Sequence, residues 1–277
     1  MKKLIIFTDL DGTLLDYATY SFEAALPALQ LMKEKEIPLV ICSSKTRKEI
    51  ESYRDRLANC HPFISENGGG IFLPGNYFKI QISKLEFPVV GSGEYDIISL
   101  GAPYTKLREV IQQIRQKGFA VKGFGDMTVG EVAELTSMPL EEAAMAKERD
   151  FDEPFVFDGD ESEVQSLIQA IESKGFNVTQ GRFFHILGYS DKGKAVSILI
   201  DLYKKQFGEI VTVALGDSPN DIPMLERVDY PVIVQKPDGS HDRRIDVPQL
   251  VRAEGIGPAG WNETIVKFLS ISRLSGQ

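Results

Sequence analysis

Short apolar segments alternate with helical patterns along the whole 277-residue chain, and this alternation most constrains the fold. Apolar runs such as Leu4–Phe7, Pro38–Cys42 and Val211–Leu215 are each followed by a segment with helical spacing. Strands that alternate with helices usually form a parallel sheet, because each helix returns the chain to the same edge. The pattern therefore predicts an α/β fold with a largely parallel sheet.

The middle of the chain differs in style and suggests a second unit inserted into the first. We predict a Rossmann-like parallel-sheet core made of residues 1–82 and 189–277, and a smaller α/β cap domain made of residues 83–188. Strand Tyr95–Leu100 is assigned to the cap, and a hairpin that pairs Ile71–Leu73 with Phe78–Ile82 is assigned to the core. Hinges are expected near Ser83 and Gly188, because lids commonly gate substrate entry.

Composition excludes several classes of function. The chain has 31 basic and 40 acidic side chains, a formal charge of −9 and no polybasic run, so neither nucleic acid nor an anionic membrane is an expected partner. The apolar runs are too short to cross a bilayer or to form a signal peptide, which favours a cytoplasmic location. Two cysteines and three dispersed histidines offer no zinc spacing. Any bound metal would be held by carboxylates, which favours a hard cation such as Mg²⁺.

Two aspartates follow the first predicted strand in the segment Asp9-Leu10-Asp11-Gly12-Thr13. Side chains alternate in extended backbone, so Asp9 and Asp11 project to the same side. The carboxyl end of a parallel strand is where open α/β sheets place their ligands. One carboxylate could act as a nucleophile and its neighbour as a proton donor, although an Asx turn would also explain the pair.

A second acidic segment, Gly216-Asp217-Ser218-Pro219-Asn220-Asp221, follows a later strand. Asp217 leaves the strand end as Asp9 does, and Asp221 is four residues further on, so the two can lie close across a helical turn. Three neighbouring carboxylates repel one another unless a cation offsets them. A capped helix start would explain this segment alone, but the two acidic segments together favour a metal site.

Two further segments could hold a phosphate group. Ser43-Ser44-Lys45-Thr46-Arg47 lies between a strand and a helix, where hydroxyls and free N–H groups form an anion site, although plain N-capping is an equal explanation. Lys192 could bind a phosphoryl oxygen as a point charge, and a solvated surface lysine is its alternative.

In their order along the chain, four elements resemble those of the haloacid dehalogenase superfamily of phosphatases. They are Asp9–Thr13, Ser43, Lys192 and Gly216–Asp221. The long insert between Ser43 and Lys192 is similar to the α/β cap of the Cof-like branch, called C2B. The resemblance implies that Asp9 attacks phosphorus and forms an aspartyl-phosphate, and that Asp11 protonates the leaving alcohol and then activates water. Ser43 and Lys192 would hold the phosphoryl group. The implied Mg²⁺ ligands are Asp9, the Asp11 backbone carbonyl and Asp217, with support from Asn220 and Asp221.

Other segments are similar to those of mannosyl-3-phosphoglycerate phosphatases. They are Cys42–Arg47, Glu66–Gly69, Gly181–His185, Asp191–Ala195 and Gly257–Asn262. The resemblance implies that the chain hydrolyses mannosyl-3-phosphoglycerate to mannosylglycerate and phosphate. The alternatives are a related phosphatase for glucosyl-3-phosphoglycerate or sucrose-6-phosphate, and a phosphosugar sensor that does not turn over.

Such a substrate carries a phosphate, a carboxylate and a sugar, and each needs polar partners. A cation or N–H donors would suit the carboxylate, and polar cap residues would suit the sugar hydroxyls. The candidate substrate-binding residues are Ser44, Lys45, Thr46, Asn67, Gly68, Arg149, Glu153, Arg182 and His185. Arg149 and Glu153 could instead pair on the surface, and His185 could be a core histidine. The sequence does not predict an oligomeric state.

Overall fold

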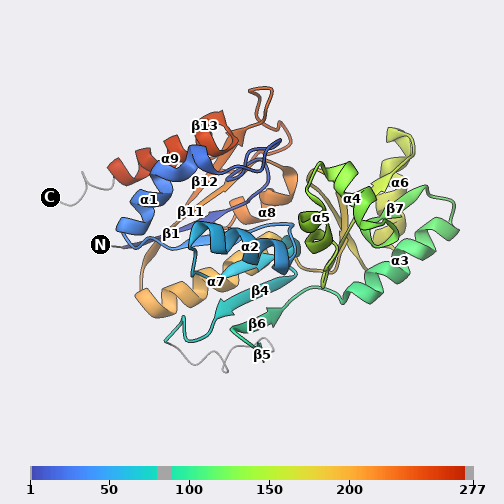
Figure 1. Cartoon of the computed structure of the whole chain (residues 1–277), viewed down its shortest axis with the longest axis horizontal. Coiled ribbons are helices and arrows are strands. Elements are labelled where there is room, and N and C mark those ends of the chain that lie inside the picture. The colour runs from blue at the N-terminus through green and yellow to red at the C-terminus, as the bar shows by residue number, and fades with distance from the viewer. Residues whose placement is uncertain (1, 80–88, 272–277) are drawn as a thin grey trace.

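The computed structural model describes residues 2–79 and 89–271, and within them the strands form two separate sheets (Figure 1). The larger sheet has nine described strands in the order β13-β12-β11-β1-β2-β3-β4-β6-β5. The strands from β13 to β3 run parallel, and the remaining three form an antiparallel edge. Their bounds are β1 Lys3–Thr8, β2 Leu39–Cys42, β3 Phe63–Ser65, β4 Gly70–Pro74, β5 Val89–Ser92, β6 Tyr95–Ser99, β11 Ile210–Gly216, β12 Tyr230–Gln235 and β13 Val251–Ile256. The predicted α/β fold is confirmed.

Helices cover both faces of this sheet, as strands that are apolar on both sides require. The side chain of Ile6 in β1 belongs to one apolar cluster, and those of Ile5 and Phe7 belong to the other. The first cluster includes residues of α1 (Leu26–Glu34), α2 (Arg47–Leu57) and α9 (Gly257–Ile271). The second includes residues of α7 (Lys192–Phe207) and α8 (Ile222–Leu225). The alternation of side chains in β1 thus matches two covered faces.

The central strand β1 joins distant parts of the chain. It pairs with β2 on one side and with β11 on the other, where Lys3 lies opposite Ile210 and Thr8 lies opposite Leu215. The indole N–H of Trp261 donates to the Thr8 hydroxyl at 3.0 Å, and this hydroxyl donates to the Asp9 carbonyl at 2.7 Å. Trp261 is fully buried, so it fixes the end of β1 as part of the core.

The smaller sheet has four described strands in the antiparallel order β7-β8-β10-β9. We call residues 102–188, which contain this sheet and its helices, the cap. Helices α3 and α6 pack on one apolar cluster with the sheet, and α4 and α5 contribute to another. The bounds are α3 Tyr104–Gln116, β7 Val121–Gly123, α4 Val129–Thr136, α5 Leu140–Ala146, β8 Asp152–Phe157, α6 Glu161–Glu172, β9 Asn177–Gln180 and β10 Phe184–Leu187. In Figure 1, α5 lies beside α2 of the core.

The sheets correct two features of the sequence analysis. Strand β6, which was assigned to the cap, pairs with β4 in the larger sheet, so the predicted boundary at residue 83 precedes two core strands. Phe78 and Lys79 lie outside any strand, and the rest of the predicted strand Phe78–Ile82 and the hinge at Ser83 lie outside the described residues. Strands β5 and β13 were not predicted, because the first is short and contains glycine and the second alternates with charged residues.

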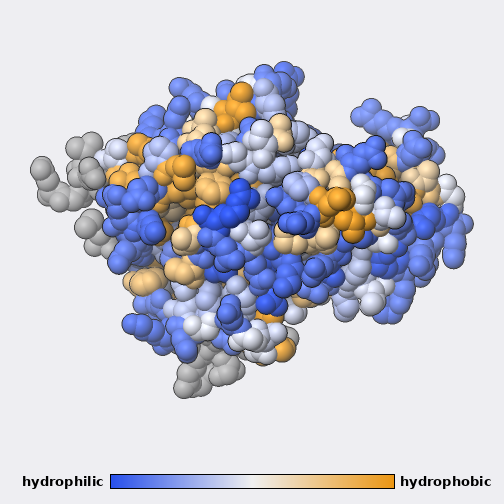
Figure 2. Space-filling view, viewed as in Figure 1, coloured by the Kyte–Doolittle hydropathy of each residue, from blue (hydrophilic) through white to orange (hydrophobic). Residues whose placement is uncertain are grey.

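The surface is mainly hydrophilic in the view of Figure 2, with hydrophobic residues in small groups among hydrophilic ones. Large exposed apolar side chains, such as Leu26, Val90 and Leu140, belong to separate elements. Among the described residues, no helix is both long enough and apolar enough to span a bilayer.

Candidate active site

Three neighbouring parallel strands end at the same edge of the larger sheet and carry the predicted site residues. Asp217 follows β11, Asp9 follows β1 and Ser43 follows β2, and these strands are adjacent in the order β11-β1-β2. The Asp9 N–H donates to the Leu215 carbonyl at 2.9 Å, which continues the ladder to the aspartate itself. The topology therefore brings residues that are about 200 positions apart to one crevice.

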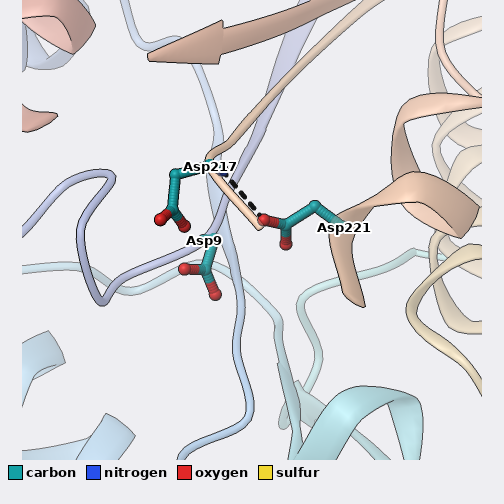
Figure 3. Close-up of side chains that lie close together, drawn as sticks. All are labelled: Asp9, Asp217 and Asp221. Carbon is teal, nitrogen blue, oxygen red and sulfur yellow. Dashed lines mark hydrogen bonds between the residues drawn. The ribbon is translucent and has the colours of Figure 1, made fainter. Parts of the chain in front are cut away.

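Three aspartates meet at this edge. Asp9, Asp217 and Asp221 each offer a carboxylate oxygen within 4.8 Å of the others, and all three are at least nine-tenths buried (Figure 3). Asp221 lies in the short 3-10 helix Pro219–Asp221, and its Oδ2 accepts hydrogen bonds from the backbone N–H of Asp217 at 3.0 Å and of Ser218 at 3.1 Å. Asp221 thus holds the loop in the shape that turns Asp217 toward Asp9.

Lys192 lies between two of these carboxylates. It begins α7, is 1% exposed, and its ammonium donates to Asp9 Oδ1 and Asp221 Oδ1, each at 2.7 Å. Burial alone would lower its pKa, but the charges of Asp221 and Asp9 raise it above the ordinary value, so the side chain is charged. Lys192 therefore offsets part of the buried negative charge.

The remaining charge fits a divalent cation. Three ionised carboxylates and one ammonium leave a net charge of −2 in a buried space, which is unfavourable without compensation. Burial and the charge of Asp221 raise the pKa of Asp217 to about 7, and burial together with neighbouring carboxylates raises the pKa of Asp9. Carboxylate oxygens are the ligands that hard cations prefer. The cluster of Asp9, Asp217 and Asp221 is therefore consistent with a divalent metal.

Gly12 and Thr13 allow the loop after β1 to approach this cluster. Gly12 has φ +77°, which L side chains rarely adopt, and a Cβ there would lie 3.0 Å from Asp217 Oδ2. The Thr13 hydroxyl donates to Asp217 Oδ1 at 3.4 Å. The glycine of the first acidic segment is thus needed for both its conformation and its lack of a side chain.

Asp11 faces a buried lysine. Lys45 Nζ lies 3.1 Å from Asp11 Oδ1 and 3.3 Å from Glu49 Oε1, and it sits 5.1 Å from the ring centroid of Tyr20. Burial would lower the pKa of Lys45, but Asp11 and Glu49 raise it, so this lysine is charged as well. Asp11 is the more exposed partner, with one third of its side chain accessible. It lines the pocket that is described next.

A pocket opens between this edge of the core and the cap. Residues of both acidic segments of the core line it, as do several residues of the cap. The lining residues include Asp9, Asp11, Tyr17, Tyr20, Ser44, Lys45, Phe124, Arg149, Arg182, Phe183, His185, Asp217 and Asn220. The predicted residues Ser44, Lys45, Arg149, Arg182 and His185 are thus brought together with the aspartates.

Four of the predicted substrate-binding residues, and the predicted phosphoryl-holding residue Ser43, do not line this pocket. Ser43 is fully buried, and its hydroxyl accepts from the Lys45 N–H at 3.2 Å. Thr46 caps α2, and its hydroxyl donates to the Met145 carbonyl in the cap at 2.9 Å. Gly68 is packed against the backbone of Asp191. Glu153 points into the cap, where Arg108, Tyr104 and the Gly125 N–H bind its carboxylate.

Asn67 is the fourth of these substrate-binding candidates. It connects residues 217–221, which we call the metal loop, to the cap through a chain of hydrogen bonds. Asn220 Nδ2 donates to Asn67 Oδ1 at 3.0 Å, and Asn67 Nδ2 donates to Asp152 Oδ2 at 2.6 Å. Asp152 Oδ1 lies 2.8 Å from His185 Nδ1, so the carboxylate holds the proton on Nδ1 and leaves Nε2 as the other polar atom of this pocket-lining ring. The orientation of His185 therefore depends on residues of both parts of the molecule.

Glu66 fastens the cap to the core next to this chain. It is fully buried, and its carboxylate accepts the backbone N–H groups of Asp150, Phe151 and Asp152 at 2.8 to 3.1 Å. Burial raises its pKa to about 8, despite the lowering effect of Arg149 and the N–H donors. Glu66 and Asn67 also have positive φ values, 48° and 54°. A strained turn is thus held in place by its contacts with the cap.

We expect the substitution Glu66→Gln to change the pH dependence of stability. Between the ordinary pKa of 4.5 and about 8, folded protein keeps a proton on Glu66 that unfolded protein releases, so wild-type stability falls as pH rises through this window. Glutamine does not titrate. The melting temperature of wild type minus that of the variant should therefore drop by several degrees from about pH 5 to about pH 8.5. The exposed Glu172→Gln is the control, and a difference that is constant with pH would contradict the assignment.

The sequence analysis did not predict Glu49 and Tyr20, which line the pocket, or Asp152, which orients His185. Glu49 pairs with Lys45, and a Thr-x-x-Glu capping pattern from Thr46 marks its position in the sequence. Tyr20 lies in a loop with φ 55°, and Asp152 begins a cap strand. No local pattern distinguishes the last two, because their contacts join residues that are more than 30 positions apart.

The fold and the carboxylate site define a hydrolase class. The chain belongs to the haloacid dehalogenase-like hydrolases, whose family pattern matches residues 6–87 and 133–238. It is 50% identical over 269 residues to the glucosyl-3-phosphoglycerate/mannosyl-3-phosphoglycerate phosphatase of Methanococcoides burtonii, which covers 96% of this chain and 97% of that relative. The protein of the same name from Persephonella marina is 44% identical over 272 residues, with 96% and 97% coverage. The suspected superfamily is confirmed.

Solved structures share the fold at low sequence identity. Thermoplasma acidophilum 0175 superposes with a TM-score of 0.68 at 17% identity and covers 97% of this chain and 99% of its own. The sucrose-phosphatase from Synechocystis, solved with sucrose and phosphate, gives a TM-score of 0.62 at 16% identity, with 97% and 98% coverage. These likenesses support the core-and-cap architecture over nearly all of the chain.

Proposed function

We propose that this protein is a Mg²⁺-dependent phosphatase that hydrolyses glucosyl- and mannosyl-3-phosphoglycerate through an aspartyl-phosphate intermediate. The buried cluster of Asp9, Asp217, Asp221 and Lys192 carries this proposal, because it combines a nucleophile, metal ligands and a fixed cation at one edge of the sheet. The full-length similarity to phosphatases with these two substrates in their names supports the choice of substrate. It widens the sequence-based expectation, which preferred the mannosyl ester.

Asp9 performs the first displacement in this proposal. One carboxylate oxygen attacks phosphorus, the bond from phosphorus to the glycerate oxygen breaks, and Asp9 keeps the phosphoryl group. The Lys192 ammonium, 2.7 Å from Asp9 Oδ1, orients the carboxylate and offsets the charge that would otherwise repel a phosphate. Asp9 and Asp217 would hold Mg²⁺, which supplies further neutralisation of the phosphoryl oxygens when bound.

Asp11 moves the proton in both steps. It gives a proton to the departing glycerate oxygen, and it then takes a proton from the water that attacks the aspartyl-phosphate. Water attack restores the Asp9 carboxylate and releases inorganic phosphate. Lys45, at 3.1 Å, fixes the position of Asp11 at the pocket wall, where the leaving group departs.

The cap supplies the groups that meet the glycosyl part of the substrate. His185 is fixed by Asp152, and Arg149 is fixed by the Ser44 carbonyl at 2.9 Å and the Ala146 carbonyl at 2.9 Å. Both line the same pocket as Asp9, and Ser44 does so from the core. Groups held by packing and hydrogen bonds before binding lose little freedom when a substrate arrives.

The test of this function is phosphate release with Mg²⁺ from a panel of phosphomonoesters. The panel contains glucosyl- and mannosyl-3-phosphoglycerate, sucrose-6-phosphate and simple hexose phosphates. A kcat/KM for the two phosphoglycerates at least about 100-fold above the others is expected, since several polar contacts discriminate between leaving groups. A preference for sucrose-6-phosphate or a flat profile would reject the substrate, and the absence of any turnover would leave a phosphosugar-binding protein.

We expect removal of the metal to stop the reaction. In excess EDTA, phosphate release should fall below about 1% of the Mg²⁺-saturated rate, because the charge on the phosphoryl group is then not offset. Added Mg²⁺ should restore it, and excess Ca²⁺ should inhibit, because Ca²⁺ takes more ligands at longer distances. Mg²⁺ should also raise the melting temperature of wild type but not of Asp217→Asn. Full activity in EDTA would contradict the cation site.

A further inference from the structure

The basic side chains around the pocket differ in whether a nearby carboxylate balances their positive charge. Lys45 pairs with Asp11 and Glu49, and Arg149 lies 3.7 Å from Asp152 and 3.9 Å from Glu49. Arg182 lines the same pocket but forms no ion pair with any carboxylate in the part of the chain that the structure describes. A guanidinium in a pocket without a counter-ion is a ready site for an anionic group of a ligand.

The position of the Arg182 guanidinium is fixed without a carboxylate. It stacks between the rings of Tyr17 and Phe183, with its central carbon 5.3 and 5.6 Å from their centroids, and it donates to the Tyr20 hydroxyl at 2.9 Å. That hydroxyl donates in turn to the Thr136 carbonyl at 3.2 Å. Two rings and one hydroxyl therefore hold the group in place, while its remaining N–H donors have no partner in the described residues.

Arg182 also lies within reach of a small molecule at the metal site. Its neighbour Gly181 packs on the metal loop, where a Cβ would lie 3.5 Å from Asn220 Nδ2. The Tyr17 ring on which Arg182 stacks lies 3.6 Å from the position of a Cβ at Gly12, beside Asp217. The phosphate and carboxylate of a 3-phosphoglycerate are separated by only a few bonds, so one ligand can reach both places.

We propose that Arg182 binds the carboxylate of the glycerate moiety and thereby selects phosphate esters that carry a second anionic group. This proposal rests on the proposed function and adds to it the residue that recognises the glycerate. The guanidinium geometry suits bidentate contact with a planar carboxylate. Because Arg182 belongs to the cap while Tyr17 and Tyr20 belong to the core, a carboxylate at this position also joins substrate recognition to the closed arrangement of the two parts.

The test compares two esters that differ only in the carboxylate. They are glucosyl-3-phosphoglycerate and glucosylglycerol 3-phosphate, in which a hydroxymethyl group replaces the carboxylate. For Arg182→Gln, kcat/KM for the first ester should fall about 100-fold and that for the second should stay within about threefold of wild type. Arg182→Lys should recover about tenfold for the first ester, because a point charge replaces the bidentate fork.

Arg56→Gln is the matched control. Arg56 also stacks on two rings, those of Phe22 and Tyr53, and has no ion pair among the described residues, but it lies outside the pocket. It should leave both esters unchanged. Equal losses for both esters in Arg182→Gln, or an unchanged preference for the carboxylate, would overturn the proposal. Calorimetry with the product glucosylglycerate should show binding to wild type and its loss in Arg182→Gln.

A second pair of esters separates this proposal from the proposed function. If wild type turns over neither glycosyl ester, its rates with 3-phosphoglycerate and glycerol 3-phosphate are compared instead. These two esters also differ in the carboxylate, so the comparison still tests recognition of that group. A preference for 3-phosphoglycerate that Arg182→Gln abolishes would retain the carboxylate site and reject only the glycosyl substrate. No preference in wild type would reject the carboxylate site.

Discussion

The substitution Asp9→Asn is expected to lower kcat by at least about 10⁴-fold, because an amide oxygen cannot replace the attacking carboxylate. The fold should remain intact. Asparagine still offers an oxygen to Lys192. A neutral side chain also avoids the burial of charge and the repulsion by neighbouring carboxylates that raise the pKa of Asp9. In EDTA, the melting temperature of the variant should therefore equal or exceed that of wild type. Circular dichroism and a thermal melt check this.

Two readouts make this result specific. In quenched reactions with labelled substrate, wild type should carry a transient acid-stable phosphoryl group on Asp9, and Asp9→Asn should carry none. The stabilisation by Mg²⁺ should also shrink in the variant, because a neutral ligand replaces a charged one. Near-wild-type turnover by the variant would exclude Asp9 as the nucleophile, and a lower melting temperature in EDTA would contradict the charge argument.

The substitution Lys192→Met is expected to reduce both activity and stability. Removal of one partner from a buried ion network costs about 3 to 5 kcal/mol, which corresponds to a melting temperature about 10 °C lower for a chain of this size. Lys192 is 1% exposed and contacts both Asp9 and Asp221, so both carboxylates lose their ammonium partner. Without the fixed cation, kcat should fall by about 10³-fold or more.

Lys194→Met is the control for this prediction. Lys194 lies in the same helix, but it is about half exposed, and its ion pair with Asp191 is long, at 3.7 Å. It should leave kcat and the melting temperature nearly unchanged. The loss of stability in Lys192→Met should be smaller in Mg²⁺ than in EDTA, since a bound cation offsets part of the uncovered charge. Equal losses in both conditions would show that Lys192 acts by packing alone.

The sequence predicts the parts of this site that depend on strand ends. Asp9, Asp217 and Ser43 follow apolar strands, so a parallel sheet brings them to one edge whatever the details of packing. For Lys192, the residues alone left a phosphate-binding cation and a solvated surface lysine as alternatives, and the family resemblance favoured the first. The contact that gives it a role comes from the entry of α7 beside Asp221, which no local pattern encodes. The position of the carboxylate cluster could thus be predicted from the sequence. The balancing of its negative charge by Lys192 could not.

The cap shows where such reasoning ends. Glu153 and His185 are both polar residues within cap strands, and they lie two and one residues from phenylalanines of the same sheet. His185 lines the pocket, but Glu153 is buried against Arg108 and Tyr104. Which of them faces the core depends on strand register in a four-stranded antiparallel sheet, and a shift of one residue exchanges the faces. Strand β6 was misplaced for a similar reason, because its partner β4 decides the sheet it joins.

The pairing of β1 with β11 also sets the order in which the molecule can be assembled. During translation, Asp9 and Asp11 leave the ribosome before the cap does, but the strand that carries Asp217 follows after the entire cap. The cap sheet is built from strands close in sequence, so it can form early, while the central pairing of the core must wait for distant residues. A nascent chain that ends before β11 contains Asp9 without Asp217 and Asp221. The cluster of Asp9, Asp217 and Asp221 can therefore assemble only after the cap has been synthesised.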